Sequence, residues 1–487
     1  MSRQSYGRAL GELAAEDPDR IAVVCGGISI SRGDLEHRSN RLARAYAARG
    51  VRSGDRVSFC LPNGIELITG CFAAWKLGAV PNPLSAHLPV PERDAILAVA
   101  APALVLGVAP DELTEVANLP AGFVPGESLS DAPLPDATAP HERALASGGS
   151  TGLPKLIVPK SDASYDRETA SPLFKAKRAV LVPGPLYHAV PFSSTFQGIL
   201  AGCKVVVMRR FDASLFLELL ELHQVDRVSL VPTMMLRVWR LPEAERLGRD
   251  LSSLEFVMSG GAPLPAWLMR AWIEWLGPEV MHEAFGPSER IGGTFINGTE
   301  WLAHPGSVGR PTNPGGIKIL DSEQKELPPG EMGEIFMMPA GGPGSTYEYI
   351  GAKANARRDG WESVGDMGYL DEDGYLYLGD RRSDMILTSG RNVYPAEVEA
   401  ALQEHPSVLS CAVIGLPDEE FGQSIHAIVE SGGDFEEASL RIHLEARLSK
   451  YKLPRSFEVV NTPLRNEAGK VRRSALRAAR LPSVPPG

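Results

Sequence analysis

A run rich in glycine and hydroxyl residues, between Ser147 and Lys155, is the part of the sequence best suited to chemistry. It reads Ser-Gly-Gly-Ser-Thr-Gly-Leu-Pro-Lys. Glycines let backbone N–H groups approach a ligand closely, hydroxyls donate hydrogen bonds without adding charge, and a lysine supplies a point cation. The run therefore predicts a loop that binds a nucleotide polyphosphate through Ser147, Gly148, Gly149, Ser150, Thr151, Gly152 and Lys155.

This loop differs from the P-loop of kinases and ATPases. The Walker pattern requires Gly-Lys followed by Ser or Thr at the start of a helix, whereas Pro154 precedes the lysine here and Leu156 follows it. The alternative interpretation is a flexible Gly/Ser loop with an incidental lysine. The loop alone does not decide between the two interpretations, so the rest of the chain must.

Charge and composition exclude several other classes of protein. The chain has 487 residues, a formal net charge of −11 and no block of Lys or Arg, which argues against a nucleic-acid surface. Its five cysteines form no Cys-x-x-Cys pair, so neither a zinc site nor a disulfide framework is indicated. The N-terminus lacks a signal peptide's apolar core, and the uncharged run at residues 95–110 is too short to span a bilayer and is broken by Pro102. We expect a cytoplasmic protein with small-molecule partners and no membrane partner.

The elements that must position the loop alternate between strands and helices. Strand-like apolar segments occupy residues 21–24, 28–30, 56–61, 179–182, 199–208, 225–231 and 254–258, and helix-like segments occupy residues 35–48 and 66–77. This alternation predicts α/β architecture with a parallel sheet covered by helices.

The last third of the chain has a different pattern. Segments 316–320, 331–338 and 375–378 are short, β-rich and bounded by Gly, Pro and Asp, which predicts a smaller antiparallel subdomain. A compact α+β module follows from about residue 385, with helices at 395–403 and 439–448. The Pro-rich tail, residues 481–487, is expected to be disordered.

Four motifs, in one order along the chain, resemble those of the adenylate-forming superfamily of acyl-CoA synthetases, carrier-loading adenylation domains and luciferases. They are the 147–155 loop, Phe285-Gly-Pro-Ser-Glu289, Gly365-Asp-Met-Gly-Tyr369 with Gly379-Asp-Arg-Arg-Ser-Asp-Met-Ile386, and Gly469-Lys470. The similarity extends from Arg32-Gly-Asp-Leu35 to Lys470. Ser-Gly-Gly-Ser-Thr-Gly followed by Gly184-Pro-Leu-Tyr-His188 is most similar to bile-acid-type CoA ligases and to ATP-dependent amide bond synthetases.

The resemblance implies an α/β fold with a large N-terminal domain, residues 1–382, made of two αβ-layered subdomains and the β-rich subdomain at about 308–380. A small, mobile α+β C-terminal domain, residues 383–487, would follow a hinge near 381–384. Ser383 stands where relatives often carry aspartate or lysine, so the resemblance leaves the behaviour of the hinge open. After a domain rotation, the segment Ser389-Gly-Arg391 would face the active site.

The resemblance also implies a ligase that uses ATP and Mg²⁺, with CoA as a co-substrate. A carboxylate is a poor electrophile because it carries full negative charge and lacks a leaving group. Its attack on the α-phosphorus of ATP gives an acyl-adenylate and pyrophosphate, and this mixed anhydride then accepts a nucleophile. Because two anions must meet, the site needs cations and oriented dipoles.

Residues at the matching positions would supply these groups. Ser150, Thr151 and the loop glycines would hold the β- and γ-phosphates beside Lys155, and Glu289 would bind Mg²⁺, for which one carboxylate with phosphate oxygens and waters suffices. The nucleotide would also contact Gly261, Ala262, Phe285, Gly286, Ser288, Asp366 and Arg381, the last two at the ribose hydroxyls.

Catalysis is assigned by the same resemblance to Lys470, His188, Thr151 and Glu289. Lys470 would contact the carboxylate and the α-phosphate, although a lone lysine in a basic tail is also consistent with a solvated side chain. His188 would orient the carboxylate or gate the nucleophile's tunnel, and a hydrogen-bonded core histidine is its alternative.

The acid is expected to bind along a mixed wall of aromatic, thioether and glycine residues: His188, Phe192, Phe196, Met234, Met235, Gly260, Gly261 and Met281. With no cation evident beyond His188, this wall favours a bulky, mostly apolar acid of the aryl, polycyclic or medium acyl class. No aspartate is placed to pair with an ammonium group, which argues against an α-amino acid.

Three functions remain open at this stage. The first is a ligase that joins a carboxylic acid to CoA, and the second is an amide bond synthetase in which an amine attacks the acyl-adenylate. The third is a nucleotide-binding protein without turnover, against which the intact Thr151, Glu289 and Lys470 argue. Any carrier protein is expected to be a separate chain, and a homodimer is the assembly considered.

Overall fold

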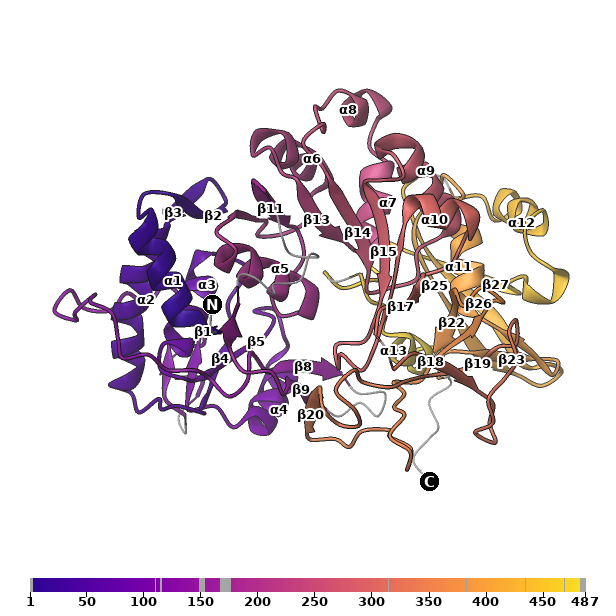
Figure 1. Cartoon of the computed structure of the whole chain (residues 1–487). Coiled ribbons are helices and arrows are strands. Elements are labelled where there is room, and N and C mark those ends of the chain that lie inside the picture. Colours follow the sequence, from indigo (N-terminus) through magenta and orange to yellow (C-terminus); the bar gives the residue numbers. More distant parts are fainter. Residues whose placement is uncertain are drawn as a thin grey trace.

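The chain folds into two helix-covered sheets, a small β region and a C-terminal α+β region (Figure 1). The computed structural model describes residues 3–109, 111–113, 116–148, 154–166, 177–313, 315–381, 383–433, 435–467 and 469–481. The tail beyond residue 481, for which disorder is predicted, lies outside these ranges.

A nine-stranded sheet forms the centre of the N-terminal part, in the order β17-β16-β15-β14-β13-β11-β12-β2-β3. The strands from β15 to β2 in this order are parallel, and both edges are antiparallel. Its strands are β2 (Ile21–Cys25), β3 (Ile28–Ser31), β11 (Ala179–Val182), β12 (Lys204–Val207), β13 (Arg227–Leu230), β14 (Phe256–Gly260), β15 (Met281–Phe285), β16 (Thr294–Asn297) and β17 (Arg310–Pro311). The predicted parallel sheet is confirmed.

Helices cover both faces of this sheet, which explains why β11 is apolar at every position. Val180 and Val182 pack in one core with α5 (Ala189–Leu200). Ala179 and Leu181 pack in the other core with α6 (Ala213–Leu222), α7 (Pro232–Trp239) and α9 (Ala266–Leu276). Successive strand residues point to opposite faces, so a strand covered on both sides buries every side chain.

A second, four-stranded parallel sheet has the order β5-β4-β6-β7. Its strands are β4 (Arg56–Phe59), β5 (Val80–Pro83), β6 (Leu104–Leu106) and β7 (Asn118–Leu119), and the neighbouring helices are α1 (Tyr6–Glu16), α2 (Arg32–Ala47), α3 (Ile65–Trp75) and α4 (Val90–Ala100). Helix α3 is buried at every position from residue 67 to 75, as expected of a helix that is apolar all round.

One predicted strand, residues 199–208, is wrong at its start. Helix α5 continues to Leu200, and β12 begins only at Lys204. Gly202 lies between them with φ +82, a left-handed conformation that glycine adopts without steric cost and that ends the helix. The apolar run therefore contains the end of a helix, a turn and a strand.

The β-rich region contains the antiparallel sheet β18-β19-β21-β22, which confirms the predicted arrangement. Its strands are β18 (Ile317–Leu320), β19 (Gly333–Met337), β21 (Asp366–Leu370) and β22 (Leu376–Arg381). Strand β20 (Tyr347–Ile350) lies between β19 and β21 in the sequence but does not join their sheet. It pairs with β9 (Pro154–Pro159), which in turn pairs with β8 (Leu145–Gly148). The β-rich region thus reaches back to the loop at residues 147–155.

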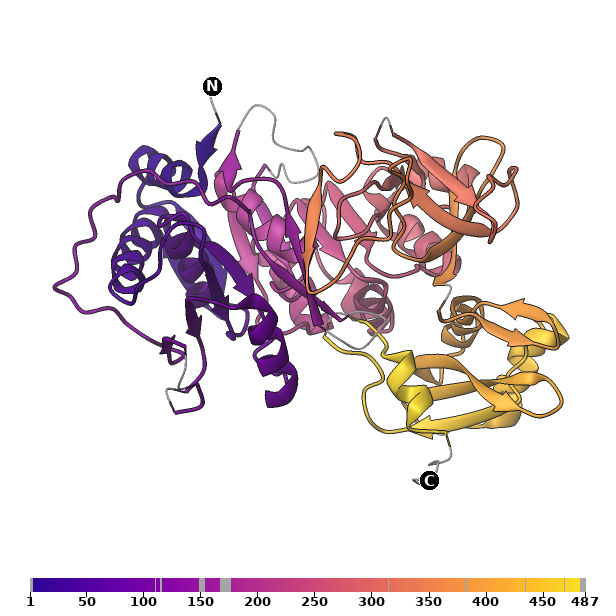
Figure 2. The ribbon, with the colours of Figure 1, turned by 90° about the horizontal axis from the view of Figure 1, so that it is seen from below.

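The C-terminal elements form a smaller group beside the large N-terminal part (Figure 2). They are the hairpin β23 (Ile386–Thr388) and β24 (Arg391–Val393), the sheet β25 (Val408–Asp418), β26 (Gly422–Ser431) and β27 (Ser456–Val460), and the helices α11 (Pro395–Gln403), α12 (Glu437–Glu445) and α13 (Arg473–Ala478). The helix predicted at 395–403 has these bounds, and the one predicted at 439–448 begins two residues earlier and ends three earlier.

The remaining short elements are β1 (Gln4–Ser5), which pairs with β10 (Ser164–Tyr165), and the helices α8 (Glu243–Leu247) and α10 (Gly298–Ala303). Within the ranges that the structure describes, no helix has the length and apolar character needed to cross a bilayer.

Candidate active site

A large cleft lies where the carboxyl ends of β13, β14 and β15 face α5, the β8–β9 hairpin and the C-terminal region. Its volume is about 2480 Å³. Ligands bind characteristically at the carboxyl ends of parallel strands. The predicted site residues that line the cleft are Ser147, Lys155, His188, Met234, Gly260, Gly261, Ala262, Phe285, Gly286, Ser288, Glu289, Asp366, Arg381 and Lys470.

The predicted phosphate loop joins β8 to β9. Ser147 pairs with Lys155 and Gly148 pairs with Pro154, so the two ends of the loop are held together as a hairpin. Gly149, Ser150, Thr151 and Gly152 lie outside the described residues. The hairpin directs Lys155 toward the ring of Tyr349, with Nζ 3.8 Å from the ring centroid.

Glu289 is nearly buried, with 6% of its surface exposed, although it lines the cleft. The hydroxyl of Tyr349 donates a hydrogen bond to its Oε1, and Lys155 Nζ lies 3.9 Å from the same oxygen. Burial and the bond to Glu289 raise the pKa of Tyr349 well above its ordinary value, so this hydroxyl remains a donor. Tyr349 was missed in the sequence, and only the alternating Tyr-Glu-Tyr-Ile pattern of β20 could have indicated its place in a strand.

The metal prediction can be tested against the donors present. Among the described residues, no group of three or more His, Cys, Asp or Glu side chains could hold a metal ion. A single buried carboxylate suits Mg²⁺ only when phosphate oxygens and waters supply the other ligands. Glu289 therefore fits a magnesium ion that arrives with a nucleotide, and it does not fit a resident structural metal.

A turn and an aromatic residue form the wall expected to face adenine. Gly261 follows β14 with φ +82, a conformation that favours glycine, and Phe285 ends the adjacent strand β15. Glu283, two residues before Phe285 and so on the same face of β15, also lines the cleft and is 5% exposed. No described residue pairs with its carboxyl group, and burial raises its pKa to about 8. Glu283 was missed because it lies outside the motif that identifies Phe285.

Asp366 and Arg381 face each other across the antiparallel pair β21 and β22. Arg381 Nε donates to Asp366 Oδ1 at 3.1 Å. Burial raises the pKa of Asp366, and the charge and hydrogen bond of Arg381 oppose this rise. The second carboxylate oxygen, Oδ2, accepts no hydrogen bond from a described residue.

Lys470 lies on a tight loop that enters the cleft from the C-terminal region. Asn466 N donates to Lys470 O, and Lys470 N donates to Asn466 Oδ1. Gly469 has φ +72, and a Cβ there would lie 2.4 Å from Thr233 Oγ1, so the loop touches α7 with no room for a side chain. The Lys470 side chain remains exposed to solvent in the wide cleft. Partial desolvation and then the charge of Arg381 lower its pKa, while the charges of Glu289 and Asp366 oppose this lowering.

His188 stands at the N-cap of α5 and lines the same cleft. Its Nε2 is buried and has no hydrogen-bond partner in the described chain, and its ring lies 4.6 Å from that of Tyr187. Burial, and then the charge of Lys470, lower the pKa of His188 to about 3. The imidazole is therefore neutral at physiological pH, and the hydrogen-bonded core histidine considered from the sequence does not describe it.

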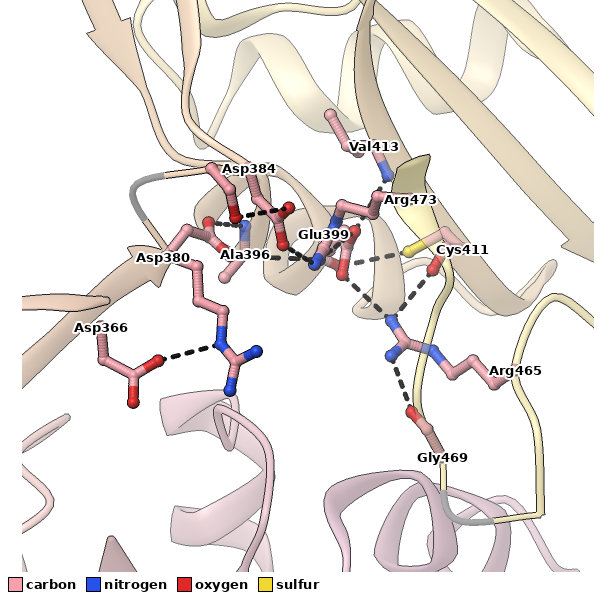
Figure 3. A network of polar contacts seen from close by, with 12 residues as sticks. Asp366, Asp380, Asp384, Ala396, Glu399, Cys411, Val413, Arg465, Gly469 and Arg473 are labelled. Atoms are coloured by element: carbon pink, nitrogen blue, oxygen red, sulfur yellow. Dashed lines mark hydrogen bonds and ion pairs between the residues drawn. The ribbon is translucent and has the colours of Figure 1, made fainter. Parts of the chain in front are cut away.

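An ion network in the C-terminal region holds the loop of Lys470 (Figure 3). Arg465 Nη1 donates to Gly469 O at 3.1 Å, and its Nη2 donates to Glu399 Oε2 and Cys411 O, both at 3.0 Å. Arg473 bridges Glu399 Oε1 at 2.8 Å and Asp384 Oδ2 at 3.1 Å. The backbone next to Lys470 is thus tied through two arginines to the segment that follows β22.

Four residues predicted to line the acid pocket lie in the core instead. Phe192 and Phe196 are 1% exposed and pack edge-on or tilted against Trp75 and each other. Met235 and Met281 are fully buried in the core on the other face of the sheet. The sequence pattern identified apolar residues near the site. The orientation of α5, α7 and β15 in the fold decides which of these residues reach the cleft.

The expectation of no cation beyond His188 is also wrong. Arg143 and Arg290 both line the cleft, next to Glu142. Their positions in the sequence, one before β8 and one after Glu289, gave no signal that they meet.

Comparison with known proteins agrees with this geometry. Residues 10–349 match the family model "AMP-binding enzyme", and residues 397–470 match "AMP-binding enzyme C-terminal domain". The chain is 33% identical to a feruloyl-CoA synthase from an Amycolatopsis species, over 98% of this chain and 99% of that protein.

Two solved structures are similar over nearly their whole length. The o-succinylbenzoate CoA synthetase of Bacillus subtilis with its acyl-adenylate intermediate superposes with a TM-score of 0.83 at 27% identity, covering 99% of this chain and 100% of that one. The same enzyme with ATP and magnesium gives 0.82 at 26% identity, covering 98% and 100%. The chain therefore belongs to the AMP-binding enzymes of the adenylate-forming superfamily, with their large N-terminal and small C-terminal domains, and is an AMP-forming ligase of the acid:CoA ligase family.

Proposed function

We propose that this enzyme activates a bulky, mostly apolar carboxylic acid as its acyl-adenylate and transfers the acyl group to CoA. The observation that carries the proposal is the convergence of Lys470, Glu289, Asp366, Arg381 and His188 on one cleft, although they are spread over nearly 300 residues of sequence. The CoA acceptor is supported by the feruloyl-CoA and o-succinylbenzoate CoA synthetases to which the chain is similar.

ATP would lie along the cleft from β15 to the β8–β9 hairpin. Phe285 and the Gly261–Ala262 turn would flank adenine, and Glu283 would meet its exocyclic amine, a donor that a buried carboxyl group lacks within the protein. The free oxygen of Asp366, with Arg381, would bind the ribose hydroxyls. The loop ends at Ser147 and Lys155, with the expected ligands Ser150 and Thr151 between them, would hold the phosphates.

Glu289 would hold the magnesium ion that accompanies ATP. Bound there, the ion would neutralise phosphate charge. Tyr349 and Lys155 fix the carboxylate of Glu289 on one side, which leaves its other oxygen, Oε2, for the ion.

In the first step, a carboxylate oxygen of the acid forms a bond to the α-phosphorus, and the bond from that phosphorus to the bridging oxygen of pyrophosphate breaks. Lys470 would stand between the two anions and stabilise the charge that gathers on the α-phosphate oxygens. Burial and the charge of Arg381 lower the pKa of Lys470, and the negative charge of the arriving phosphates and carboxylate would act against this lowering. His188, being neutral, would orient the carboxylate by donating one N–H without competing with Lys470 for its charge.

The acid would enter between α5 and the carboxyl ends of β13 and β14. The apolar part of this wall comes from Ala189, Val190, Pro191, Val231, Met234, Met258 and Leu264. A wall of this kind favours an aryl or medium acyl body, in line with the expectation from the sequence. A cytoplasmic location, a homodimeric assembly and the hinge at 381–384 stay predictions.

Acid-dependent exchange of labelled pyrophosphate into ATP, measured over a panel of aryl and acyl acids, tests the first half-reaction. Exchange with at least one acid is expected, and ATP binding without exchange would indicate a nucleotide-binding protein without turnover. Mass spectrometry with CoA and a simple amine supplied together tests the acceptor. An acyl-CoA product supports the proposal, whereas an amide as the main product would establish the amide bond synthetase instead.

A further inference from the structure

The cleft wall changes from apolar to polar along α5, moving away from His188. Ser193 and Gln197 lie one turn apart on the side of α5 that lines the cleft. Gln197 Nε2 donates to the hydroxyl of Tyr6 at 3.0 Å, and Ser193 Oγ accepts a hydrogen bond from Arg143 at 3.1 Å. An acid that begins at His188 and extends along α5 therefore ends among charged and hydroxyl groups.

In this polar end the guanidinium groups of Arg143 and Arg290 share the carboxylate of Glu142. Arg143 Nη1 donates to Glu142 Oε1 at 2.7 Å, and Arg290 donates to both oxygens of Glu142, at 2.9 Å and 3.3 Å. Ser161 Oγ completes the group as a donor to Glu142 at 3.3 Å. Glu142 and Arg143 are 5% and 2% exposed, so this pair is shielded from solvent, whereas 39% of the Arg290 side chain is exposed.

One edge of the Arg143 guanidinium has no hydrogen-bond partner in the part of the chain that the structure describes. The hydrogen bonds of Arg143 to described residues both come from Nη1, and neither Nε nor Nη2 has a partner among those residues. An Nε without a partner is not distinctive by itself, because the Nε atoms of Arg465 and Arg473 also have no hydrogen-bond partner among the described residues. What distinguishes Arg143 is that Nη2 is free as well, which leaves the paired Nε and Nη2 donors that bind a carboxylate through two hydrogen bonds.

We propose that the acid substrate carries a second carboxylate, at the end remote from the reacting one, and that Arg143 and Ser193 bind it. The inference rests on the proposed function and adds the class of acid: a dicarboxylic acid with an apolar body. The unpartnered edge of Arg143, with its two parallel donors, selects a planar anion such as a carboxylate.

The helix sets the length of this acid. Five residues separate His188 from Ser193, which corresponds to about 7–8 Å along the axis of α5. An aromatic ring with a short unsaturated arm spans that distance between two carboxyl groups. The matched probes are therefore trans-4-carboxycinnamic acid and trans-4-methylcinnamic acid, which differ only in the remote group.

The test compares kcat/KM for these two probes in pyrophosphate exchange. Wild-type enzyme should prefer the dicarboxylic acid by tenfold or more, and Arg143→Met should remove the preference while leaving the KM for ATP unchanged. Arg143→Lys should keep part of the preference, because it restores the charge without the two-donor edge. Arg178→Met, which removes an exposed arginine away from the cleft, is the matched control and should retain the full preference.

Equal kcat/KM values for the two probes in the wild type, or an equal loss for both in Arg143→Met, would overturn the inference while exchange itself continues. Absence of exchange with any acid would instead count against the proposed function and, with it, this inference. If Arg143→Met does not fold, Ser193→Ala and Arg143→Lys provide the comparison, and an unchanged probe ratio in both would again overturn the assignment.

Discussion

Two clusters, each built around two arginines, differ in how many of the arginine donors have hydrogen-bond partners within the described part of the protein. In the C-terminal cluster, Arg465 and Arg473 use both of their terminal nitrogens, on Glu399, Asp384 and backbone oxygens. In the cleft cluster, Arg143 and Arg290 share Glu142, and Nη2 of Arg143 has no partner among the described residues. A cluster whose donors all have partners within the protein holds the surrounding backbone in one conformation. A cluster in a cleft that has donors without partners favours a ligand that accepts hydrogen bonds from them.

The two clusters therefore serve the reaction differently. The C-terminal one acts on Lys470 through the backbone, because Arg465 binds the carbonyl of Gly469. The cleft cluster would act on the substrate directly.

The largest effect is expected at Lys470, because the C-terminal cluster holds the loop that carries it. Lys470→Ala should lower the rate of pyrophosphate exchange about 10³–10⁴-fold, a loss of about 4–5 kcal/mol in transition-state stabilisation. The variant should still convert a pre-formed acyl-adenylate to the CoA ester. Lys450→Ala, an exposed lysine of the same domain, is the control and should keep full exchange. Equal loss of both half-reactions in Lys470→Ala would contradict its role in adenylation.

Breaking the satisfied cluster should cost stability. Glu399→Gln removes the charge that both Arg465 and Arg473 face in the protein interior, so we expect the free energy of unfolding to fall by about 3–5 kcal/mol. Denaturant unfolding of the C-terminal region measures it. Glu445→Gln, on the exposed side of α12, should change it by less than about 0.5 kcal/mol. A fall of less than 1 kcal/mol in Glu399→Gln would show that the cluster is not a structural one.

Asp380, which lies beside Arg473 of the same cluster, is expected to make the free energy of unfolding depend on pH. Burial raises its pKa to about 6, while Arg473 and the backbone N–H of Ala396 oppose the rise, and Glu399 and Asp384 add to it. Because the folded form binds the proton more tightly than the unfolded form does, Asp380 favours folding most at low pH. Its contribution is lost as the pH rises through about 4 to 6, by about 3 kcal/mol.

Asp380→Asn removes this titration. The free energy of unfolding of the wild type should therefore fall relative to that of Asp380→Asn as the pH is raised from 4 to 7, measured by denaturant unfolding at several pH values. A difference between the two proteins that stays constant with pH would contradict the assignment.

The smallest effect is expected at the edge of the cleft cluster. Ser193→Ala removes the hydroxyl that accepts from Arg143 Nη1, so the guanidinium loses one support but keeps its bond to Glu142. We expect the preference for the dicarboxylic probe to fall about fivefold, or about 1 kcal/mol. Competition kinetics with both probes in one reaction measure the ratio. Ser252→Ala, on an exposed turn, is the matched control.

Much of the site could be predicted because the chemistry is carried by short local motifs. The phosphate loop, Glu289, Asp366, Arg381 and Lys470 were each identified by immediate neighbours in the sequence, and the described ones line one cleft. The alternation of strands and helices indicated the parallel sheet for a similar reason, since its periods are local.

The family, the order of its motifs and the residue types available for catalysis thus follow from the linear order of residues. Three further features emerge only in the folded chain: Phe192 and Phe196 pack on Trp75 rather than line the acid pocket, Tyr349 reaches Glu289, and Arg143 and Arg290 share Glu142. These outcomes depend on which face of a helix or strand turns toward which neighbour, and on contacts between residues up to 148 positions apart in the sequence. Hydrophobicity and spacing do not determine which neighbour a helix or strand face packs against, because an apolar side chain is stabilised by burial against any apolar partner.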